Sequence, residues 1–256
     1  MFFKFNLYNV YYHYITMKKI VFIIPILFLY SCQESLFNSG EMITQEIKTS
    51  PFKNIEINDI FEVYLYQDTI EKIIVKGGSN LVSNLTFDVN QEKTLTIDNL
   101  NNARWSRDYE KIELHITVDT LHFLTLNAPA RVRCMDTLKT PELKIFSISE
   151  YAEISVLVNC NNLYLVNSGT SGGQISLKGS TLNFGFWARA SLQLFAEDFI
   201  AKKITAKNES IGNCYIHATE YLSVEILRTG LIYYHGNPET IEYVNDEAKD
   251  KLIKID

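Results

Sequence analysis

Ala130-Arg131-Val132-Arg133-Cys134 and Gly173-Gln174-Ile175-Ser176-Leu177 are two of six copies of one short pattern, in which a small residue precedes two alternating apolar residues. The other copies begin at Ala152, Ala190, Gly212 and Gly230. The steps between the small residues are 22, 21, 17, 22 and 18, an average of 20 residues. Such a regular return indicates a repeat fold.

A second apolar pair precedes each copy by eight to ten residues. These pairs are Leu121/Phe123, Leu143/Ile145, Leu163/Leu165, Leu182/Phe184, Ile204/Ala206 and Leu222/Val224. Alternating apolar residues form the inward face of a strand, so each step contains two short strands. One rung cannot bury its inward face alone and must stack on the next. We therefore predict an all-β fold in which residues 121–240 form a parallel β-helix with about 20 residues per rung.

The outward positions of the second strand are polar in the first four copies and become apolar or aromatic in the last two. Tyr215, Leu231 and Tyr233 then lie side by side on adjacent rungs and form a candidate binding patch. Such a patch can stack sugars or dock a protein. The alternative is that the charged tail, residues 241–256, covers it.

The N-terminus carries an export signal at residues 17–32. Lys18 and Lys19 precede an apolar run that is too short to span a bilayer, which is typical of a signal peptide. Cys32 directly follows Ser31, which resembles the acylation site of bacterial lipoproteins; an ordinary secretory signal is the alternative. Residues 1–16 are interpreted as an upstream extension from a miscalled start, and residues 33–50 as a tether.

Residues 51–120 interrupt the repeat with strands that look antiparallel, around turns such as Gly77-Gly78. We expect them to form an antiparallel β module that caps the open N-terminal end of the solenoid, because a bare end would expose core and unpaired edges. The tail after residue 240 is expected either to cover the other end or to fray.

The composition excludes several function classes. After removal of Lys4, Lys18 and Lys19 with the signal, 21 basic and 30 acidic residues remain, a net charge of −9, which argues against nucleic-acid binding. Cys134 and Cys214 occupy inward positions four rungs apart, about 19 Å and beyond disulfide reach. The scattered cysteines and histidines suggest no metal site, and nothing in the sequence implies a cofactor.

A polysaccharide lyase or hydrolase is the enzymatic alternative, because parallel β-helices also host such enzymes. These sites need clustered carboxylates or a basic residue at matching positions of adjacent rungs. The candidates Glu150, Glu153, Arg189 and Arg228 show no carboxylate pair on neighbouring rungs, so we predict no enzymatic activity unless they converge in a groove.

Three Asp-Thr pairs precede apolar residues, with their threonines at Thr69, Thr120 and Thr137. They resemble the acceptor sequence of a general O-glycosylation system in some bacteria. The same residues also form turns that lead into strands, and this reading is the favoured one.

The ending Gly230-Leu231-Ile232-Tyr233-Tyr234-His235-Gly236-Asn237-Pro238 resembles that of the head GIN family, also called auto-transporter adhesins, which are exported bacterial lipoproteins. Pro51-Phe52-Lys53-Asn54-Ile55-Glu56-Ile57, Val75-Lys76-Gly77-Gly78-Ser79-Asn80-Leu81 and Trp105 are similar to other parts of that family. The resemblance implies a right-handed β-helix in the cell envelope.

Together these features predict an outer-membrane lipoprotein, on the surface or the periplasmic face, anchored by a lipid at Cys32. We expect a non-catalytic adhesin-like or scaffold solenoid that binds glycans or envelope proteins. A periplasm-facing structural or sensing lipoprotein is a further alternative, and the sequence does not indicate an oligomeric state.

Overall fold

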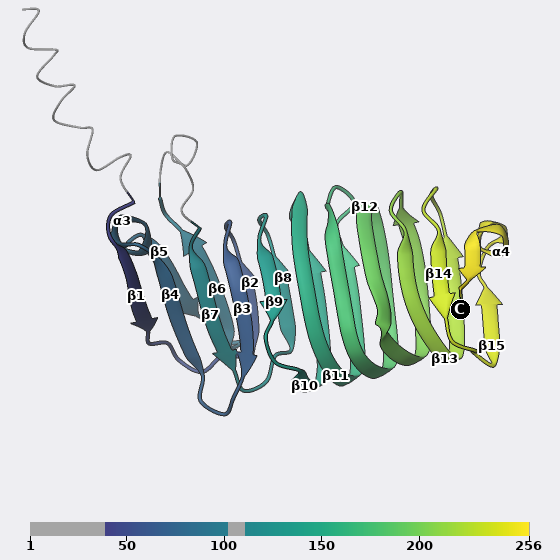
Figure 1. Cartoon of the computed structure of the whole chain (residues 1–256), viewed down its shortest axis with the longest axis horizontal. Helices are drawn as coiled ribbons and strands as arrows, with labels where there is room; N and C mark the ends of the chain where they lie inside the picture. The colour runs from purple at the N-terminus through teal and green to yellow at the C-terminus, as the bar shows by residue number, and fades with distance from the viewer. Residues whose placement is uncertain (1–38, 102–110, 256) are drawn as a thin grey trace, which may run out of the picture.

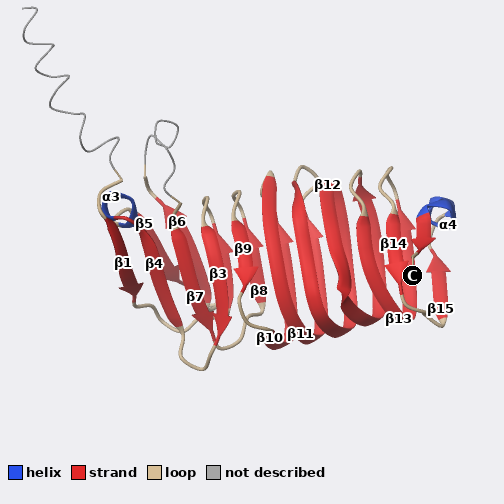
Figure 2. Ribbon diagram, viewed as in Figure 1, coloured by secondary structure: helices blue, strands red, loops and turns tan. Residues whose placement is uncertain are grey.

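The computed structural model describes residues 39–101 and 111–255 and shows a β-solenoid of about 6 turns with about 21 residues per rung (Figures 1 and 2). This confirms the predicted parallel β-helix. The strands are β1 (Met42–Ile47), β2 (Asn54–Ile57), β3 (Glu62–Gln67), β4 (Lys72–Gly78), β5 (Leu85–Val89), β6 (Thr94–Asn99), β7 (Glu113–Val118), β8 (Phe123–Leu126), β9 (Arg131–Cys134), β10 (Leu138–Ser147), β11 (Tyr151–Asn167), β12 (Gly172–Ser210), β13 (Cys214–Ile226), β14 (Ile232–His235), β15 (Thr240–Tyr243) and β16 (Leu252–Lys254). Within the described residues, two short helices, α3 (Ser79–Val82) and α4 (Asp246–Lys251), lie at opposite ends of the coil (Figure 1).

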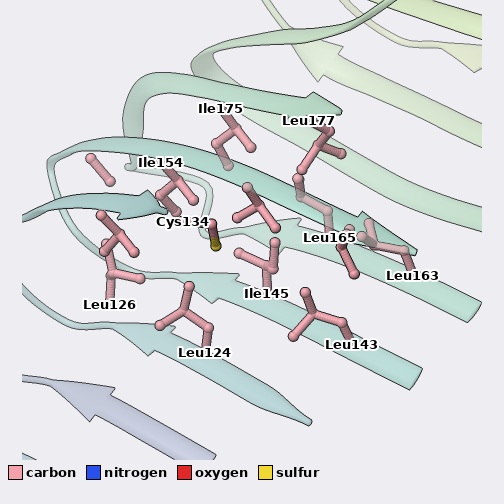
Figure 3. Close-up of a cluster of buried hydrophobic side chains, with 14 of the residues drawn as sticks. Leu124, Leu126, Cys134, Leu143, Ile145, Ile154, Leu163, Leu165, Ile175 and Leu177 are labelled. Atoms are coloured by element: carbon pink, nitrogen blue, oxygen red, sulfur yellow. The ribbon is translucent and has the colours of Figure 1, made fainter. Parts of the chain in front are cut away.

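The core is built from inward side chains that stack in register from rung to rung. Leu124, Ile145 and Leu165 are partners on β8, β10 and β11, while Ile154 and Ile175 are partners on β11 and β12. All five are almost completely buried and converge from the two sides of the coil (Figure 3). Each fully buried Leu or Ile contributes about 1.5–3 kcal/mol, so the stack of rungs supplies the burial that one rung lacks.

Two of the apolar pairs that the sequence predicted to point inward are out of phase. Phe123 and Leu182 are exposed, whereas Leu124 and Phe184 are buried. In the run Phe123-Leu124-Thr125-Leu126, either alternating set could face the core, and the structure buries the two leucines. Pairing of Leu124 with buried Ile145 fixes this choice.

The small residues mark close approaches between rungs, although one copy of the pattern has a different register. A Cβ on Gly173 would lie 2.1 Å from the carbonyl oxygen of Ala152 on the neighbouring rung. The sequence pattern aligns Ala190 with Gly212 as the small residues of two neighbouring rungs. In the structure Leu194 pairs with Cys214, so the residue opposite Gly212 is Leu192, two positions after Ala190. The corner absorbs the two-residue difference, and Ala190 has a φ of 53° there.

The N-terminal rungs are not stacked in the order of the chain. Strands β2 and β3 form one rung, and both pair in parallel with two neighbours: β6 and β7 on one side, β8 and β9 on the other. The chain therefore builds the rung of residues 94–118 outside the rung of residues 54–67. Residues 119–122 then pass back across two rung spacings, about 10 Å.

Antiparallel strands finish the N-terminal end. β4 pairs antiparallel with β7 and with β1, and β5 pairs antiparallel with β6. Between β4 and β5, helix α3 buries Leu81 and Val82. The predicted antiparallel module thus contributes the outermost strands, whereas β2, β3, β6 and β7 join the parallel coil. Strand β1 lies inside the range expected to be a tether.

The C-terminal residues form a compact end. β15 extends the sheet beyond β13, β16 pairs in parallel with β14, and α4 connects them. Ala248 of α4 is completely buried. The last turn of the core is therefore closed by the residues that the sequence left as either a cover or a frayed tail.

Neither helix in the described ranges has the length and apolar character required to cross a bilayer. The expected extension, the signal peptide, Cys32, Trp105 and the first part of the tether lie outside the described residues.

Candidate functional site

Three exposed aromatic rings gather on the outer side of β8, β10 and β11. Phe123, Phe146 and Tyr164 are 42%, 39% and 43% exposed, although Leu124, Ile145 and Leu165 beside them in the chain are buried in the core. We call these three residues the aromatic face. Exposed aromatic side chains gathered on one sheet face mark a binding surface more often than scattered ones do.

Strand register fixes the arrangement of the rings. Phe123 and Tyr164 stand in one row with Lys144 between them, and Phe146 stands in the next row beside Lys144. At ordinary strand spacing, the two ends of the first row are about 10 Å apart along the solenoid axis. Phe146 is displaced from that row by about 7 Å along the strand.

Lys144 lies at the centre of the aromatic face. Its Nζ lies 4.9 Å from the ring centroid of Phe123 and 6.0 Å from that of Tyr164, within the range of cation–π attraction. The same Nζ lies 2.8 Å from Oε1 of Glu142. Its charge is therefore balanced, and its aliphatic stem adds to the apolar surface between the rings.

Gly185 and two asparagines complete the surroundings of Tyr164. A Cβ on Gly185 would lie 3.1 Å from Cδ1 of Tyr164, so glycine leaves room for the ring on the next rung. Beside this row, Asn183 donates from Nδ2 to Oδ1 of Asn162 over 2.9 Å. Polar amide groups thus border the exposed rings.

Trp187 follows on the next rung but its ring is covered by cations. The guanidinium carbon of Arg189 lies 4.4 Å from the ring centroid and Nζ of Lys207 lies 4.9 Å from it. The indole Nε1 donates to Glu209 over 3.1 Å. Because these contacts cover and hold its ring, Trp187 marks the border of the aromatic face and is not part of it.

The predicted patch of Tyr215, Leu231 and Tyr233 lies on another part of the coil. The rings of Tyr215 and Tyr233 stack at 4.9 Å, and Phe195 stacks on the other side of Tyr215 at 5.6 Å. Leu231 is half-buried in the row beside them, and Ile253 of β16 pairs with Tyr233. The tail thus extends this row rather than lying over it, and the ring faces of Tyr215 are occupied by its neighbours.

The face formed by β3, β9 and β11 is held by an ionic network. Arg131 contacts the carboxylates of both Glu62 and Glu153, and Lys111 and Arg133 also contact Glu62. The hydrogen bond from Arg131 lowers the pKa of Glu153, and the same bond raises the pKa of Arg131. These carboxylates are engaged as structural partners across the rungs.

The enzymatic alternative required Glu150, Glu153, Arg189 and Arg228 to converge. Instead, Glu153 contacts Arg131, while Nε of Arg189 lies 3.5 Å from Glu209. The structure thus gives Glu153 and Arg189 separate partners on different faces.

The three Asp-Thr pairs come together at one corner of the coil. The backbone N–H of Asp68 donates to the carbonyl of Val118, which directly precedes the second pair, and Gln67 N–H donates to the Asp136 carboxylate. Thr69 and Thr137 are exposed and Thr120 is half-buried. The Asp68 carboxylate accepts the N–H of Thr69 over 2.6 Å, which is the local bond of a turn.

The described cysteines and histidines form one close pair, His217 and His235, whose ring centroids lie 6.0 Å apart. Cys134 and Cys214 are buried free thiols, and burial raises the pKa of each to about 12. His115 stacks on Tyr64 at 4.8 Å. Within residues 39–101 and 111–255, no group of three His, Cys, Asp or Glu side chains is placed to hold a metal ion.

Sequence reasoning missed the aromatic face because it assigned Phe123 to the core. The available signal was the second alternating set, Leu124 and Leu126, which frees Phe123 for the outer row. Phe146 and Tyr164 are outward neighbours of correctly predicted core residues, but only strand register brings them near Phe123.

Several solved structures share this fold. A putative adhesin from Bacteroides fragilis NCTC 9343 matches with a TM-score of 0.70 and 20% identity over 84% of this chain and 93% of that one. A putative lipid binding protein from Parabacteroides distasonis ATCC 8503 matches with a TM-score of 0.59 and 19% identity, over 85% and 98%. A putative adhesin from the same organism has a TM-score of 0.56 and 15% identity, over 84% and 95%. At these identities the likeness shows the fold alone.

No curated protein matches the chain. The family model described as "Putative auto-transporter adhesin, head GIN domain" matches residues 51–238, which is most of the sequence and includes all residues of the aromatic face. The chain therefore belongs to the head GIN domain family.

Proposed function

We propose that this protein is a non-catalytic, adhesin-like lipoprotein of the cell envelope whose solenoid binds glycans or envelope proteins. The observation that carries the proposal is the aromatic face, three exposed rings held on rigid strands of the coil. The family description names adhesins, which supports a binding role.

The arrangement of charged groups favours binding over catalysis. Glu62 and Glu153 contact arginines within the ionic network, and Glu142 contacts Lys144. A general acid or base needs a carboxyl or imidazole group that reaches the substrate with a suitable pKa. Carboxylates already bound to neighbouring cations are poorly suited to that role.

A lipid on Cys32 would orient the solenoid on the membrane. Residues 33–41 separate Cys32 from β1, a reach of at most about 30 Å for an extended chain. The end that carries β1 and α3 would then lie near the outer membrane, and the α4 end would point away. The aromatic face would stand along the side of the anchored coil.

Labelling of intact cells tests the location and the role. We expect an antibody against the solenoid to label whole cells and added protease to remove the domain, while a periplasmic control protein stays intact. Cys32→Ser should release the protein from the membrane fraction. Protection until the outer membrane is permeabilised would overturn the adhesin role and favour a periplasm-facing structural or sensing lipoprotein.

We also propose that Thr69, Thr120 and Thr137 carry O-linked glycans. Support comes from their shared corner on three adjacent rungs, where Thr69 and Thr137 are exposed. Intact-mass measurement of the protein purified from its native envelope should show added hexose-type masses that fall stepwise in Thr→Ala variants. An unmodified mass would leave these residues as turn formers only.

A further inference from the structure

We infer that the aromatic face binds an extended, uncharged polysaccharide that lies along the solenoid axis. This inference rests on the proposed function and specifies its ligand class and its site. It follows from the exposure of the rings, their spacing, their polar border and the balance of charge around them.

The rings of the aromatic face are separated from one another, unlike those of the Tyr215 stack. Phe123 and Tyr164 stand two rungs apart, and Phe146 occupies the neighbouring row. Lys144 lies against one side of the Phe123 ring at 4.9 Å, but Phe123 and Tyr164 remain 42% and 43% exposed, so each keeps apolar surface that the C–H side of a sugar ring can cover. In the stack, Tyr215 has an aromatic neighbour at 4.9 Å on one side and at 5.6 Å on the other, so its faces are taken.

Polar groups border the rings at the positions where a bound sugar would present its hydroxyl groups. Glu142, Asn162 and Asn183 form the row directly beside Lys144 and Tyr164. The carboxylate of Glu142 accepts hydrogen bonds, and the amides of Asn162 and Asn183 both donate and accept them. An apolar platform with a border of directional hydrogen-bonding groups fits a carbohydrate, which has both apolar and hydroxyl-rich surfaces.

The charged groups around the aromatic face favour an uncharged polysaccharide over an anionic one. Lys144 lies 2.8 Å from Glu142, and Lys207 lies 2.8 Å from Glu225 at the border. Arg189 is likewise close to Glu209. Because these cations are balanced by carboxylates, the surface offers no excess positive charge to a uronate, sulfate or phosphate polymer.

The spacing of the aromatic rings indicates the direction in which the bound polysaccharide runs. The row from Phe123 to Tyr164 runs along the solenoid axis for about 10 Å, the scale of a disaccharide repeat, with Phe146 beside its midpoint. Weak contacts at several rings add along one polymer, so affinity should rise with the length of the oligosaccharide. The binding step forms no covalent bond.

Affinity electrophoresis of the purified full-length protein in detergent tests the inference. The gels would contain mixed-linkage β-glucan, galactomannan or α-mannan as uncharged probes, and polygalacturonate as the anionic probe. We expect at least one uncharged polysaccharide to retard the protein, with little change between low and high salt. Retardation by polygalacturonate alone, or by none of the four, would overturn the inference.

Variants locate the site. Tyr164→Ala and Phe146→Ala should each weaken binding about fivefold to tenfold, and the triple variant with Phe123→Ala should abolish it. Tyr243→Ala is the matched control, since Tyr243 is also 43% exposed but lies on β15 at the C-terminal end. Circular dichroism and thermal unfolding would verify folding, since surface substitutions usually alter stability little. Equal retardation of the triple variant and the wild type would refute the site.

Two further outcomes separate the inference from the proposed function. If no uncharged polysaccharide retards the protein but antibody and protease reach the domain on intact cells, the inference fails and the adhesin role stands. If the aromatic face binds an uncharged polysaccharide but the domain is protected on intact cells, the inference stands and the adhesin role fails. Binding only to phosphatidylcholine vesicles would assign the face to a lipid surface and overturn the inference.

Discussion

Cys214 should make the protein lose stability in alkali by an amount that can be worked out from its burial. Its side chain is completely buried on β13, in register with Leu194 and Ile232, and burial raises the pKa of the thiol from 9.0 to about 12. In the unfolded chain the thiol ionises near its ordinary pKa, so above pH 9 the folded state binds more protons. Stability is therefore fully present below pH 9 and declines as the pH rises toward 12.

The size of the decline follows from the shift. Each pH unit between the two pKa values removes about 1.4 kcal/mol, so the thiol costs about 2 kcal/mol of stability at pH 10.5 and about 4 kcal/mol at pH 12. Cys214→Ala removes this dependence. The substitution should lower stability by about 1 kcal/mol at pH 7.5 through lost packing. At pH 10.5 the variant should equal or exceed the wild type.

Urea unfolding of both proteins at pH 7.5, 9, 10 and 10.5, followed by circular dichroism, measures the difference. Ionisation of tyrosines occurs in both proteins and cancels in the comparison. The thiol of the native wild type should also react very slowly with a disulfide reagent at pH 8. A difference in free energy of unfolding that stays constant with pH would refute the reasoning, because a shifted pKa must appear as a pH-dependent stability.

Three other predictions concern the rungs and the C-terminal end. Gly173→Ala should destabilise the fold by more than 1 kcal/mol in urea unfolding, because its φ is 115° and the Cβ would lie 2.1 Å from a backbone oxygen, whereas Gly185→Ala should be milder. Glu153→Gln should reduce stability at pH 7 by less than about 1 kcal/mol, since the pair with Arg131 is partly exposed. Because the pKa of Glu153 is lowered by Arg131, the advantage of the wild type should be present above pH 4.5 and should decline as the pH falls through the folded pKa, and a difference that does not decline with falling pH would contradict the assignment. Truncation after Asn245 removes α4 and β16, so it should lower the melting temperature and promote association through the opened end, as measured by calorimetry and light scattering.

The repeat itself was readable from the sequence because burial in a strand has a period of two. Alternation at Ile154/Val156 and Ile175/Leu177 predicted the inward rows, and these residues are buried. The prediction of which residues point inward was wrong where two alternating apolar sets overlap, as at Phe123, because alternation alone does not say which set faces the core.

The order of the N-terminal rungs could not be predicted from alternation. A strand shows the same pattern whether its neighbour is parallel or antiparallel, and β2 gives no local signal that both β6 and β8 will flank it. Likewise, the aromatic face arises from residues 123, 146 and 164, whose proximity depends on the register between rungs rather than on any local motif.

The out-of-order stacking near the N-terminus limits how this protein could change its length. From β10 to β13 each pass of the chain lies on the pass before it, and Ala152 and Gly173 occupy equivalent positions one step apart. If one whole rung were duplicated or lost in this part, the rungs on either side of it could still pair with each other in the same register. Before Cys134, removal of one rung would separate partners that the chain visits out of sequence. Relatives of different length should therefore gain and lose rungs between residues 138 and 226, with the N-terminal part held constant.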